Sequence, residues 1–500
     1  MRQPIFVALM SFAVTTTTAF ADVAVDGRFK GTLAGIADGG RDLGLSNNGD
    51  HQQGYIDLTP WVHVQFGDHW GMFFRPEGYA QTGQLLRPGN DANNVQTDTS
   101  SSNGNTKYGF VAVKEAWIEY TGITDYPGEF FRVGRQRIRQ DDGEWWDTDI
   151  DAARWVLDTT QIQAEFGGAR QFNRYSYRSD RAPLPTDQRD RTYVFGSVGG
   201  EWLERNRLTL RAVYAKDDNT PHLPDADEVI DPNATKTRHF DGAWIGITAH
   251  DHYFDWKRPP HFGYWAQAIA LTGKQQDSIF TSTTDPNTGV TTTTVQNPPT
   301  RRTTLDAWAT EGGLKVCMPR RWPIQFGGLY AYSTGARGGE DQNGQLVDPS
   351  KQFYQTGVES NYSRFTGTRS LIHRFNEAYR AELGNLMAAT AFTSIDVGHY
   401  DASAVFNQFW RTEGGAPVVS DGITVQPVNG KSELGRGYDL VMTRYFSVRS
   451  DDVLESHEGE AESSAIRIRG SMFTPGAAYH DDTHKPHDEY RAVLELVLWF

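Results

Sequence analysis

The chain has 500 residues, of which 38% are hydrophobic and 22% are charged, and its formal net charge is −15 at pH 7. After residue 21 no apolar run approaches the ~20 residues of a membrane-spanning helix, which excludes a helical membrane protein. The single cysteine, Cys317, excludes an intramolecular disulfide scaffold, and an aromatic content of 12% excludes a disordered chain.

The first 21 residues have the layout of a secretory signal peptide. Arg2 supplies a positive start, residues 5–10 and 12–14 supply an apolar stretch, and Ala19-Phe20-Ala21 is a small-residue cleavage site. We therefore expect one mature domain, residues 22–500. Losing Arg2 would make its net charge about −16. This acidic balance argues against nucleic acid as a partner, because proteins that bind nucleic acid usually carry basic patches.

The remainder of the chain alternates apolar and polar residues in short segments separated by Gly, Asn, Asp and Pro, as β-strands and hairpins do. Ile466 and Ile468, for example, alternate with Arg467 and Arg469. About eighteen segments show this pattern. In chain order they are residues 23–38, 54–67, 69–82, 108–121, 128–140, 150–160, 161–178, 191–202, 206–217, 238–250, 261–274, 303–318, 322–335, 387–397, 401–411, 437–446, 464–473 and 490–500.

Two features favour a transmembrane β-barrel over a large secreted β-protein. The first is the contrast between tight turns, such as residues 203–206, and long polar connections, which suits the short periplasmic turns and long extracellular loops of outer-membrane barrels. The long connections are residues 83–107, 216–238, 275–302 and 336–368. The second is the last strand, which ends on Phe500 and resembles the assembly signal of bacterial barrel proteins. We expect an all-β, antiparallel barrel of about 18 strands with long extracellular loops and an aqueous lumen, located in a Gram-negative outer membrane.

The densest basic cluster lies in residues 131–139. Strand alternation places Arg135, Arg137 and Arg139 on one face, about 7 Å apart. Three guanidiniums in register belong in the lumen, because each costs about 2–4 kcal/mol at the lipid midplane. Arg467 and Arg469 repeat the arrangement near the other end of the chain, and a basic ring of this kind selects anions. The alternative is that the arginines pair with nearby acids and stiffen the wall; these acids are Asp141, Asp142, Glu144, Asp147 and Asp149.

Several long motifs resemble the alginate-export outer-membrane porins. They include GRQRIRQDDGEWWDTDI at 134–150, the segment 355–386 that begins QTGVESNYSRFTGTRS, and AIRIRG at 465–470 with MFTPGAAY after it. GRDLG at 40–44, TDYPGEFFRVGRQR at 124–137, FNQFWR at 406–411 and the terminal WF extend the match over essentially the whole mature chain.

The resemblance implies an eighteen-stranded barrel with a narrow, electropositive lumen that passes a polyuronate to the cell surface. The lumen residues implied by motif are Lys114, Arg137, Arg467 and the acidic partner Asp147. The sequence departs from the family where arginines are replaced by Thr59, Tyr362 and Leu371. Neighbouring arginines are available to compensate for these losses; they are Arg364, Arg369 and Arg374.

Our main hypothesis is an anion-selective channel that exports alginate or a similar polyuronate through an arginine- and lysine-lined lumen. The runner-up is an uptake porin for small anionic sugars or uronate oligosaccharides, and a polysaccharide hydrolase or lyase on a barrel is a third class. We expect no catalytic residues, no cofactor and no resident metal, and we expect the polymer, outer-membrane lipid and periplasmic export proteins as partners. The substrate-binding residues expected in the lumen are Lys114, Arg135, Arg137, Arg139, Asp147, Arg467 and Arg469.

Several loops and a pair of tryptophans have more than one interpretation. The polar loop 83–107 and the acidic connection 447–464 are candidate gates, or else solvated loops. Residues 371–383 have the spacing of a short helix whose apolar side chains either pack the loop or bind the polymer. Residues 480–488 hold His and Asp, which are more often solvated than metal-binding. Trp145 and Trp146 either stack on sugar rings or lie at the membrane interface.

Overall fold

The fold is seen in a computed structural model. It describes residues 23–44, 51–82, 109–126, 128–170, 191–217, 225–226, 229–230, 238–257, 261–284, 291–318, 323–340, 346–423, 425–427, 430–446, 463–480 and 485–500. The expected signal peptide and the candidate gate 83–107 lie outside these residues, as do residues 447–462 of the second gate. In the described part, no helix is long and apolar enough to cross a membrane.

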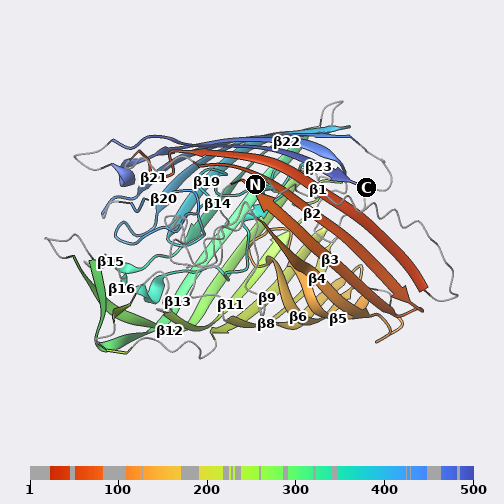
Figure 1. Cartoon of the computed structure of the whole chain (residues 1–500), viewed down its shortest axis with the longest axis horizontal. Coiled ribbons are helices and arrows are strands. Elements are labelled where there is room, and N and C mark those ends of the chain that lie inside the picture. Colours follow the sequence, from red (N-terminus) through yellow and green to blue (C-terminus); the bar gives the residue numbers. More distant parts are fainter. Residues whose placement is uncertain are drawn as a thin grey trace, which may run out of the picture.

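Eighteen long antiparallel strands close into a barrel (Figure 1). They are β1 (Val23–Gly39), β2 (His51–Phe66), β3 (Trp70–Gln81), β4 (Gly109–Tyr120), β5 (Glu129–Arg139), β6 (Asp147–Asp158), β7 (Ile162–Arg170), β8 (Arg191–Leu203), β9 (Asn206–Asp217), β11 (Arg238–His250), β12 (Phe262–Thr284), β13 (Thr291–Met318), β14 (Ile324–Ser333), β19 (Leu386–Val397), β20 (Tyr400–Arg411), β21 (Glu433–Tyr445), β22 (Ala465–Pro475) and β23 (Glu489–Trp499). The two-residue β10 (Val229–Ile230) adds to β13. Strands β1 and β23 close the ring, from Lys30 opposite Trp499 to Gly39 opposite Tyr490. The expected all-β barrel is confirmed.

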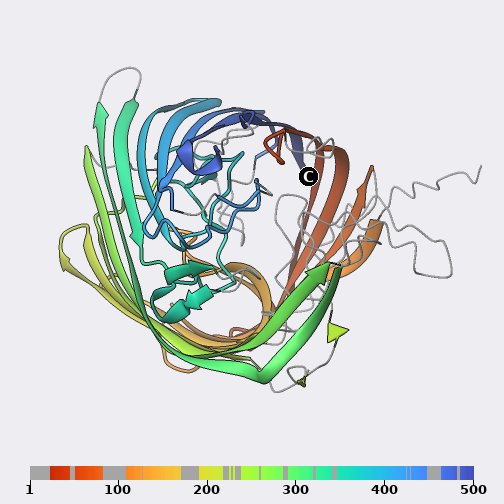
Figure 2. The same cartoon turned by 90° about the vertical axis from the view of Figure 1, so that its left-hand side faces the viewer.

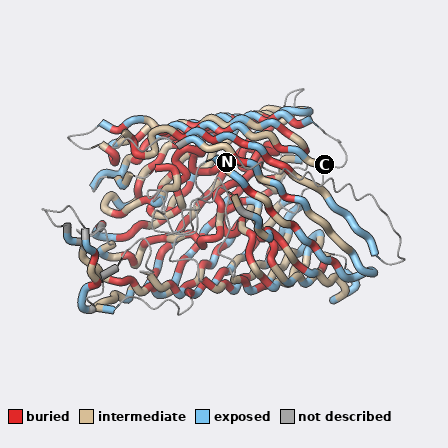
Figure 3. The backbone as a smooth tube through the Cα atoms, in the orientation of Figure 1, coloured by how far each residue is buried: buried red, intermediate tan, exposed pale blue. Residues whose placement is uncertain are grey.

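Alternation along the strands separates a lipid-facing surface from an interior. On β21, Leu440 and Met442 are 51% and 50% exposed, whereas Val441 and Thr443, which alternate with them, are buried. Figure 3 shows this exposed and buried alternation along the wall. The outward residues are apolar, which is the composition that a bilayer requires, while the inward set includes many charged and amide side chains.

The two rims differ as expected. Turns at 67–69, 159–161, 204–205 and 398–399 lie at one end, called here the short-turn end, and the longer connections mostly lie at the other. One boundary was wrong: much of 275–302, expected to be a loop, belongs to β12 and β13, which pair as far as Thr284 opposite Thr291. The threonines of this segment are β-branched, and they extend the hairpin because such residues favour strands.

The connection between β14 and β19, residues 334–385, does not remain outside the barrel. We call it the inner loop; Figure 2 shows it inside the ring of strands. It contains the short strands β15 (Arg337–Glu340), β16 (Leu346–Asp348), β17 (Tyr362–Ser363) and β18 (Ile372–His373), and the 3-10 turn η2 (Pro349–Lys351). A second 3-10 turn, η3 (Ala477–Tyr479), lies between β22 and β23. The expected loop at 336–368 is therefore largely a folded core element rather than an extracellular strand connector.

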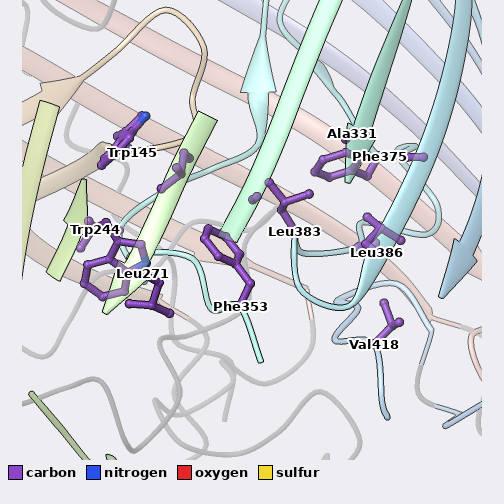
Figure 4. Close-up of a cluster of buried hydrophobic side chains, with 14 of the residues drawn as sticks. Trp145, Trp244, Leu271, Ala331, Phe353, Phe375, Leu383, Leu386 and Val418 are labelled. Atoms are coloured by element: carbon purple, nitrogen blue, oxygen red, sulfur yellow. The ribbon is translucent and has the colours of Figure 1, made fainter. Parts of the chain in front are cut away.

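The inner loop is held by an apolar core that it shares with the wall. Figure 4 shows Phe353, Phe375 and Leu383 among the side chains of this buried cluster, with Trp244 of β11 and Leu386 of β19. The short helix expected at 371–383 is wrong, because this segment forms β18 and a series of turns. The apolar spacing instead serves packing against strands on several sides, which irregular backbone achieves as well as a helix.

Candidate functional site

The basic residues of β5 lie opposite acidic residues of β6. In the antiparallel register, Arg135, Arg137 and Arg139 face Asp151, Asp149 and Asp147. The distance from Arg135 Nη1 to Asp151 Oδ2 is 3.3 Å. Arg137 pairs with Asp147 and lies 3.9 Å from Asp149, and Arg139 is partly exposed. Three predicted cations and the predicted acid Asp147 are thus brought together.

The part of the β5–β6 hairpin farther from the short-turn end leaves the wall and turns into the barrel. Pairing between β4 and β5 ends at Ala116 opposite Arg135. Gly134, just before this point, has a φ of 126°, and a Cβ there would lie 2.3 Å from the Ala116 carbonyl oxygen. Only glycine accommodates both the close approach and this backbone conformation. As a result residues 135–138 are buried on both faces, and the Arg137 side chain is only 2% exposed.

Lys114 on β4 contributes to the same charged region. Its Nζ lies 3.4 Å from Glu77 Oε1 of β3. Next to this pair, Arg75 contacts Glu115, and Glu115 also accepts a hydrogen bond from the Arg137 backbone amide at 3.2 Å. The alternation of β3 and β4 does not reveal this link, because a bulge between Arg75 and Pro76 shifts their register. The sequence analysis therefore missed Arg75, Glu77 and Glu115.

The second predicted group lies on β22 and is more open. Arg467 lies 3.3 Å from Glu495 of β23, and Arg469 lies 3.5 Å from the same carboxylate. Arg469 also binds Glu377 of the inner loop at 2.6 Å. The side chains of Arg467 and Arg469 are 15% and 11% exposed. Tyr362, at a position where the family resemblance implies an arginine, donates its hydroxyl proton to Glu377 at 3.0 Å.

The inner loop brings further charges that sequence reasoning did not place. Arg374 bridges Glu144 of the β5–β6 connection and Glu311 of β13, and all three are buried. Arg369 pairs with Asp396 of β19 at 2.7 Å. The compensating arginines proposed from sequence, including the buried Arg364, thus anchor the loop to the wall or to itself. A signal was present in the sequence: the loop alternates arginines with aromatic residues, which is unusual for a solvated connection.

Two acids of the inner loop carry perturbed pKa values. Burial, with a contribution from the nearby Glu144 charge, raises the pKa of Glu359 to about 7. Burial also raises the pKa of Glu382, and the charges of Glu359 and Asp421 add to this effect. Glu359 accepts hydrogen bonds from the Thr356 hydroxyl and the Gly357 amide, at 3.0 and 2.6 Å. The negative charge inside the barrel therefore depends on pH near neutrality.

Trp145 and Trp146 do not have either expected location. Both are 1% exposed and belong to the core beneath the inner loop, so they neither present a free face to a sugar nor reach the membrane interface. Trp145 Nε1 donates to Gln267 at 2.9 Å. The reason is the inward bend of the β5–β6 hairpin, which packs the two rings against the inner face of other wall strands: Trp146 lies on Tyr193 and Phe195 of β8, and Gln267 belongs to β12.

The remaining sequence-based expectations concern arginine loss and metal binding. Thr59 is buried, and its hydroxyl donates to the Lys30 carbonyl at 3.4 Å. Residues 481–484 of the His/Asp segment lie outside the described residues. Within the ranges given above, no group of three or more His, Cys, Asp or Glu side chains is placed to hold a metal ion.

Chemically, the charges form a ladder of ion pairs around an interior of mixed sign. Lys114, Arg135, Arg137, Arg467 and Arg469 each contact at least one carboxylate. Guanidiniums match carboxylates by paired hydrogen bonds. An incoming carboxylate can therefore exchange with the protein's own acid at the partly exposed pairs, whereas the buried pairs hold the scaffold.

Comparison with known proteins gives a consistent assignment. A family model described as alginate export matches residues 37–493. The alginate production protein AlgE of Pseudomonas aeruginosa is 35% identical over 475 residues, which cover 94% of this chain and 90% of that protein. The protein of the same name from Pseudomonas syringae pv. tomato is 32% identical, over 93% and 92% of the two chains. Among solved structures, P. aeruginosa OpdK with vanillate has a TM-score of 0.48 at 8% identity, covering 95% of this chain and 99% of that one.

Proposed function

The chain belongs to the alginate export family and is an outer-membrane channel for alginate export, and we propose that the inward-facing arginines and lysine of its lumen select the polymer. The observation that carries the proposal is the set of ion pairs on β5–β6 and β22–β23 inside a closed barrel. Alginate carries about one carboxylate per sugar, so its passage requires cationic donors that replace water of hydration.

The proposed selecting residues have two different roles. Arg467 and Arg469 are partly exposed, so they can contact a passing carboxylate directly. Arg139 on β5 is partly exposed and is placed to do the same from another sector of the wall, whereas Arg135 is buried. Arg137, Asp147 and Lys114 are buried, so they act through their electric field and by holding the hairpin in position.

Paired cations suit transport better than free ones. A lumen of unpaired arginines would hold a polyanion too tightly to release it, because conduction requires sites that bind weakly enough to be left. At each pair here, the gain from binding a uronate is reduced by the loss of the resident carboxylate. The polymer can then move from one pair to the next without a deep energy minimum.

We propose that the protein acts as a channel and not as an enzyme, since its relatives are named for alginate production and the family for export. Supply of polymer from the periplasm then drives movement, and periplasmic export proteins are the expected partners. Cleavage of mannuronate oligomers by the purified protein would contradict this.

The selectivity proposal is tested by neutralising one arginine on each face of the wall. Arg467→Gln removes an inward charge, and Arg444→Gln removes an outward charge beside it, since Arg444 pairs with Ile466 in the β21–β22 register and is exposed on the lipid side. We expect Arg467→Gln to lower the chloride-to-potassium permeability ratio and to weaken block by mannuronate oligomers in planar bilayers. Arg444→Gln should change neither quantity.

An unchanged permeability ratio in Arg467→Gln would show that β22 does not line the selective path. Equal effects of the two substitutions would show that selectivity arises from general surface charge. Oligomers that cross or block only when added from outside would favour the uptake porin instead.

A further inference from the structure

A row of aromatic rings and cations crosses the inner wall at the short-turn end, which is the periplasmic end of an outer-membrane barrel. We call this row the periplasmic belt. It runs from β1 through β5, and its members are Lys30, Trp61, Phe73, Trp117, Phe130 and Arg132. Nothing in the ion-pair ladder described above requires these rings.

The members of the belt on β2–β5 contact one another in sequence around the wall. The ring centroids of Trp61 and Phe73 are 5.5 Å apart, and Phe73 stacks on Trp117 at 5.1 Å with an interplanar angle of 13°. The Arg132 guanidinium lies 3.8 Å from the Trp117 ring centre and 4.8 Å from that of Phe130. The Lys30 ammonium lies 5.5 Å from the ring of Trp499, on the far side of the β1–β23 seam.

Strand alternation places the belt inside the barrel. The residues next to its members, such as Phe74, Ile118 and Phe131, are 44%, 47% and 42% exposed on the lipid side. Membrane-interface aromatic residues anchor a barrel from outside, so that role does not explain rings on the inner face.

The belt has a buried layer and an accessible layer. Phe73 and Trp117 are buried, whereas Trp61, Phe130 and Arg132 are partly exposed. The buried rings therefore act as a base that orients the accessible ones. Partly exposed apolar groups that lie together beside a cation are typical of a binding site.

A uronic acid residue has the chemistry that this surface fits. Its pyranose ring presents an apolar C–H face, which packs on aromatic rings, and its carboxylate pairs with a neighbouring cation. Arg132 already binds Glu119, with 2.9 Å from Nε to Oε2, so a uronate would exchange with an internal partner as in the ladder. The charge and the ring surface thus occur together at one level of the wall.

We propose that the periplasmic belt is a sugar-binding site that receives uronate residues of the polymer as it enters the lumen. This inference rests on the proposed export function and adds to it a stacking site that is distinct from the selecting arginines. Binding at the entrance aligns the chain before it passes the inner loop.

The test uses the full-length protein in planar bilayers, with mannuronate oligomers added to one side at a time. Trp61→Ala removes an accessible ring, Trp61→Phe retains one, and Trp70→Ala is the matched control because Trp70 is 51% exposed on the lipid side near the same rim. Polyglutamate serves as a polyanion without sugar rings. If Trp61→Ala does not insert into the bilayer, Phe130→Ala replaces it, because it removes the other accessible ring.

We expect Trp61→Ala to raise the dissociation constant for oligomer block from the periplasmic side about fivefold to tenfold, or about 1 to 1.4 kcal/mol. Trp61→Phe and Trp70→Ala should stay near the wild-type value. Block by polyglutamate, and the chloride-to-potassium permeability ratio, should be unchanged in all variants.

If Trp61→Ala and Phe130→Ala both keep the wild-type dissociation constant for oligomer block, the belt is not a sugar-binding site, while the export function is unaffected. A loss of uronate and polyglutamate block in equal measure would overturn the stacking site in favour of a purely electrostatic effect. Absence of any oligomer block in the wild-type channel would instead contradict the proposed function itself.

Discussion

Individual charged residues inside the barrel are distinguished by how far each is withdrawn from water. Arg137 and Arg374 are nearly inaccessible and have close carboxylate partners, whereas Arg467 keeps contact with the lumen. A buried ion pair contributes little net stability but is costly to break, because the remaining charge is left without a partner. Buried ion pairs therefore hold the segments that they connect in place, and the partly exposed ion pairs are available for exchange with a substrate.

Glu359 makes the charge of the lumen sensitive to pH. Burial raises its pKa to about 7, so the carboxyl is mostly neutral below this pH and negative above it. Raising the pH from 6 to 8 should therefore lower the chloride-to-potassium permeability ratio. Glu359→Gln should flatten this part of the pH profile in bilayer recordings, while Glu204→Gln, in the exposed turn between β8 and β9, should leave it unchanged. A profile that Glu359→Gln does not alter would assign the titration to another group.

For single residues, the sequence predicted which face of a strand a side chain lies on better than it predicted the ion-pair partner of that side chain. Alternation predicted that Arg467 and Arg469 lie on the inward face of their strand, where the structure has them. This prediction needs only the residues next to each arginine in the sequence. Their partners, Glu495 and Glu377, lie on another strand and on the inner loop. Such contacts depend on barrel closure and on loop placement, which a local pattern does not contain.

Among the elements, the inner loop departs most from a simple barrel. It bonds to β8 through Tyr193 and Thr356, to β19 through Ser394 and Thr366, and to β21 through Asn376 and Asp439. Asn376 also has a positive φ, which asparagine tolerates better than most residues. These links make the loop a fixed partition of the lumen.

Arg374 ties the inner loop to the β5–β6 connection and to β13, so its loss should loosen the attachment of the loop to the wall. Arg374→Met leaves Glu144 and Glu311 buried without their cation, which costs about 3–5 kcal/mol. We expect a lower unfolding temperature in detergent and a higher single-channel conductance than in wild type. The control Arg436→Met alters a lipid-facing arginine of β21 and should affect neither. Adding Glu144→Gln and Glu311→Gln to Arg374→Met should restore part of the stability; failure to do so would show that the ion pairs are not the cause.

The strands were predictable and the inner loop was not, for a physical reason. A transmembrane strand must present one face to lipid, so alternation is imposed on its sequence. The segment 336–368 has no such constraint, and its Thr, Asn and Gly content is typical of solvated loops. Phe353 and Phe365 within it, both fully buried, were the sign that it packs against something.

For the whole molecule, these features define one sector for the polymer. Hydrogen bonds and ion pairs link the inner loop to wall strands from β6 to β22, and the charge of Arg380 also acts on Asp38 of β1 and Arg491 of β23. The periplasmic belt lies on β1–β5, at the short-turn end of the wall. We expect a polymer that enters over the belt to continue along the wall formed by β1–β4, beside the inner loop.

This asymmetry predicts which inward positions a water-soluble reagent reaches. In a Cys317→Ser background, Lys30→Cys places a thiol at a partly exposed inward position of β1. Ser394→Cys places one beneath the inner loop, where the serine hydroxyl donates to the Thr366 carbonyl at 2.6 Å. A charged methanethiosulfonate added to the periplasmic side should reduce the conductance of Lys30→Cys rapidly and leave Ser394→Cys nearly unaffected. Equal rates at both positions would show that the inner loop does not divide the lumen, because the reagent would then reach both sectors of the wall.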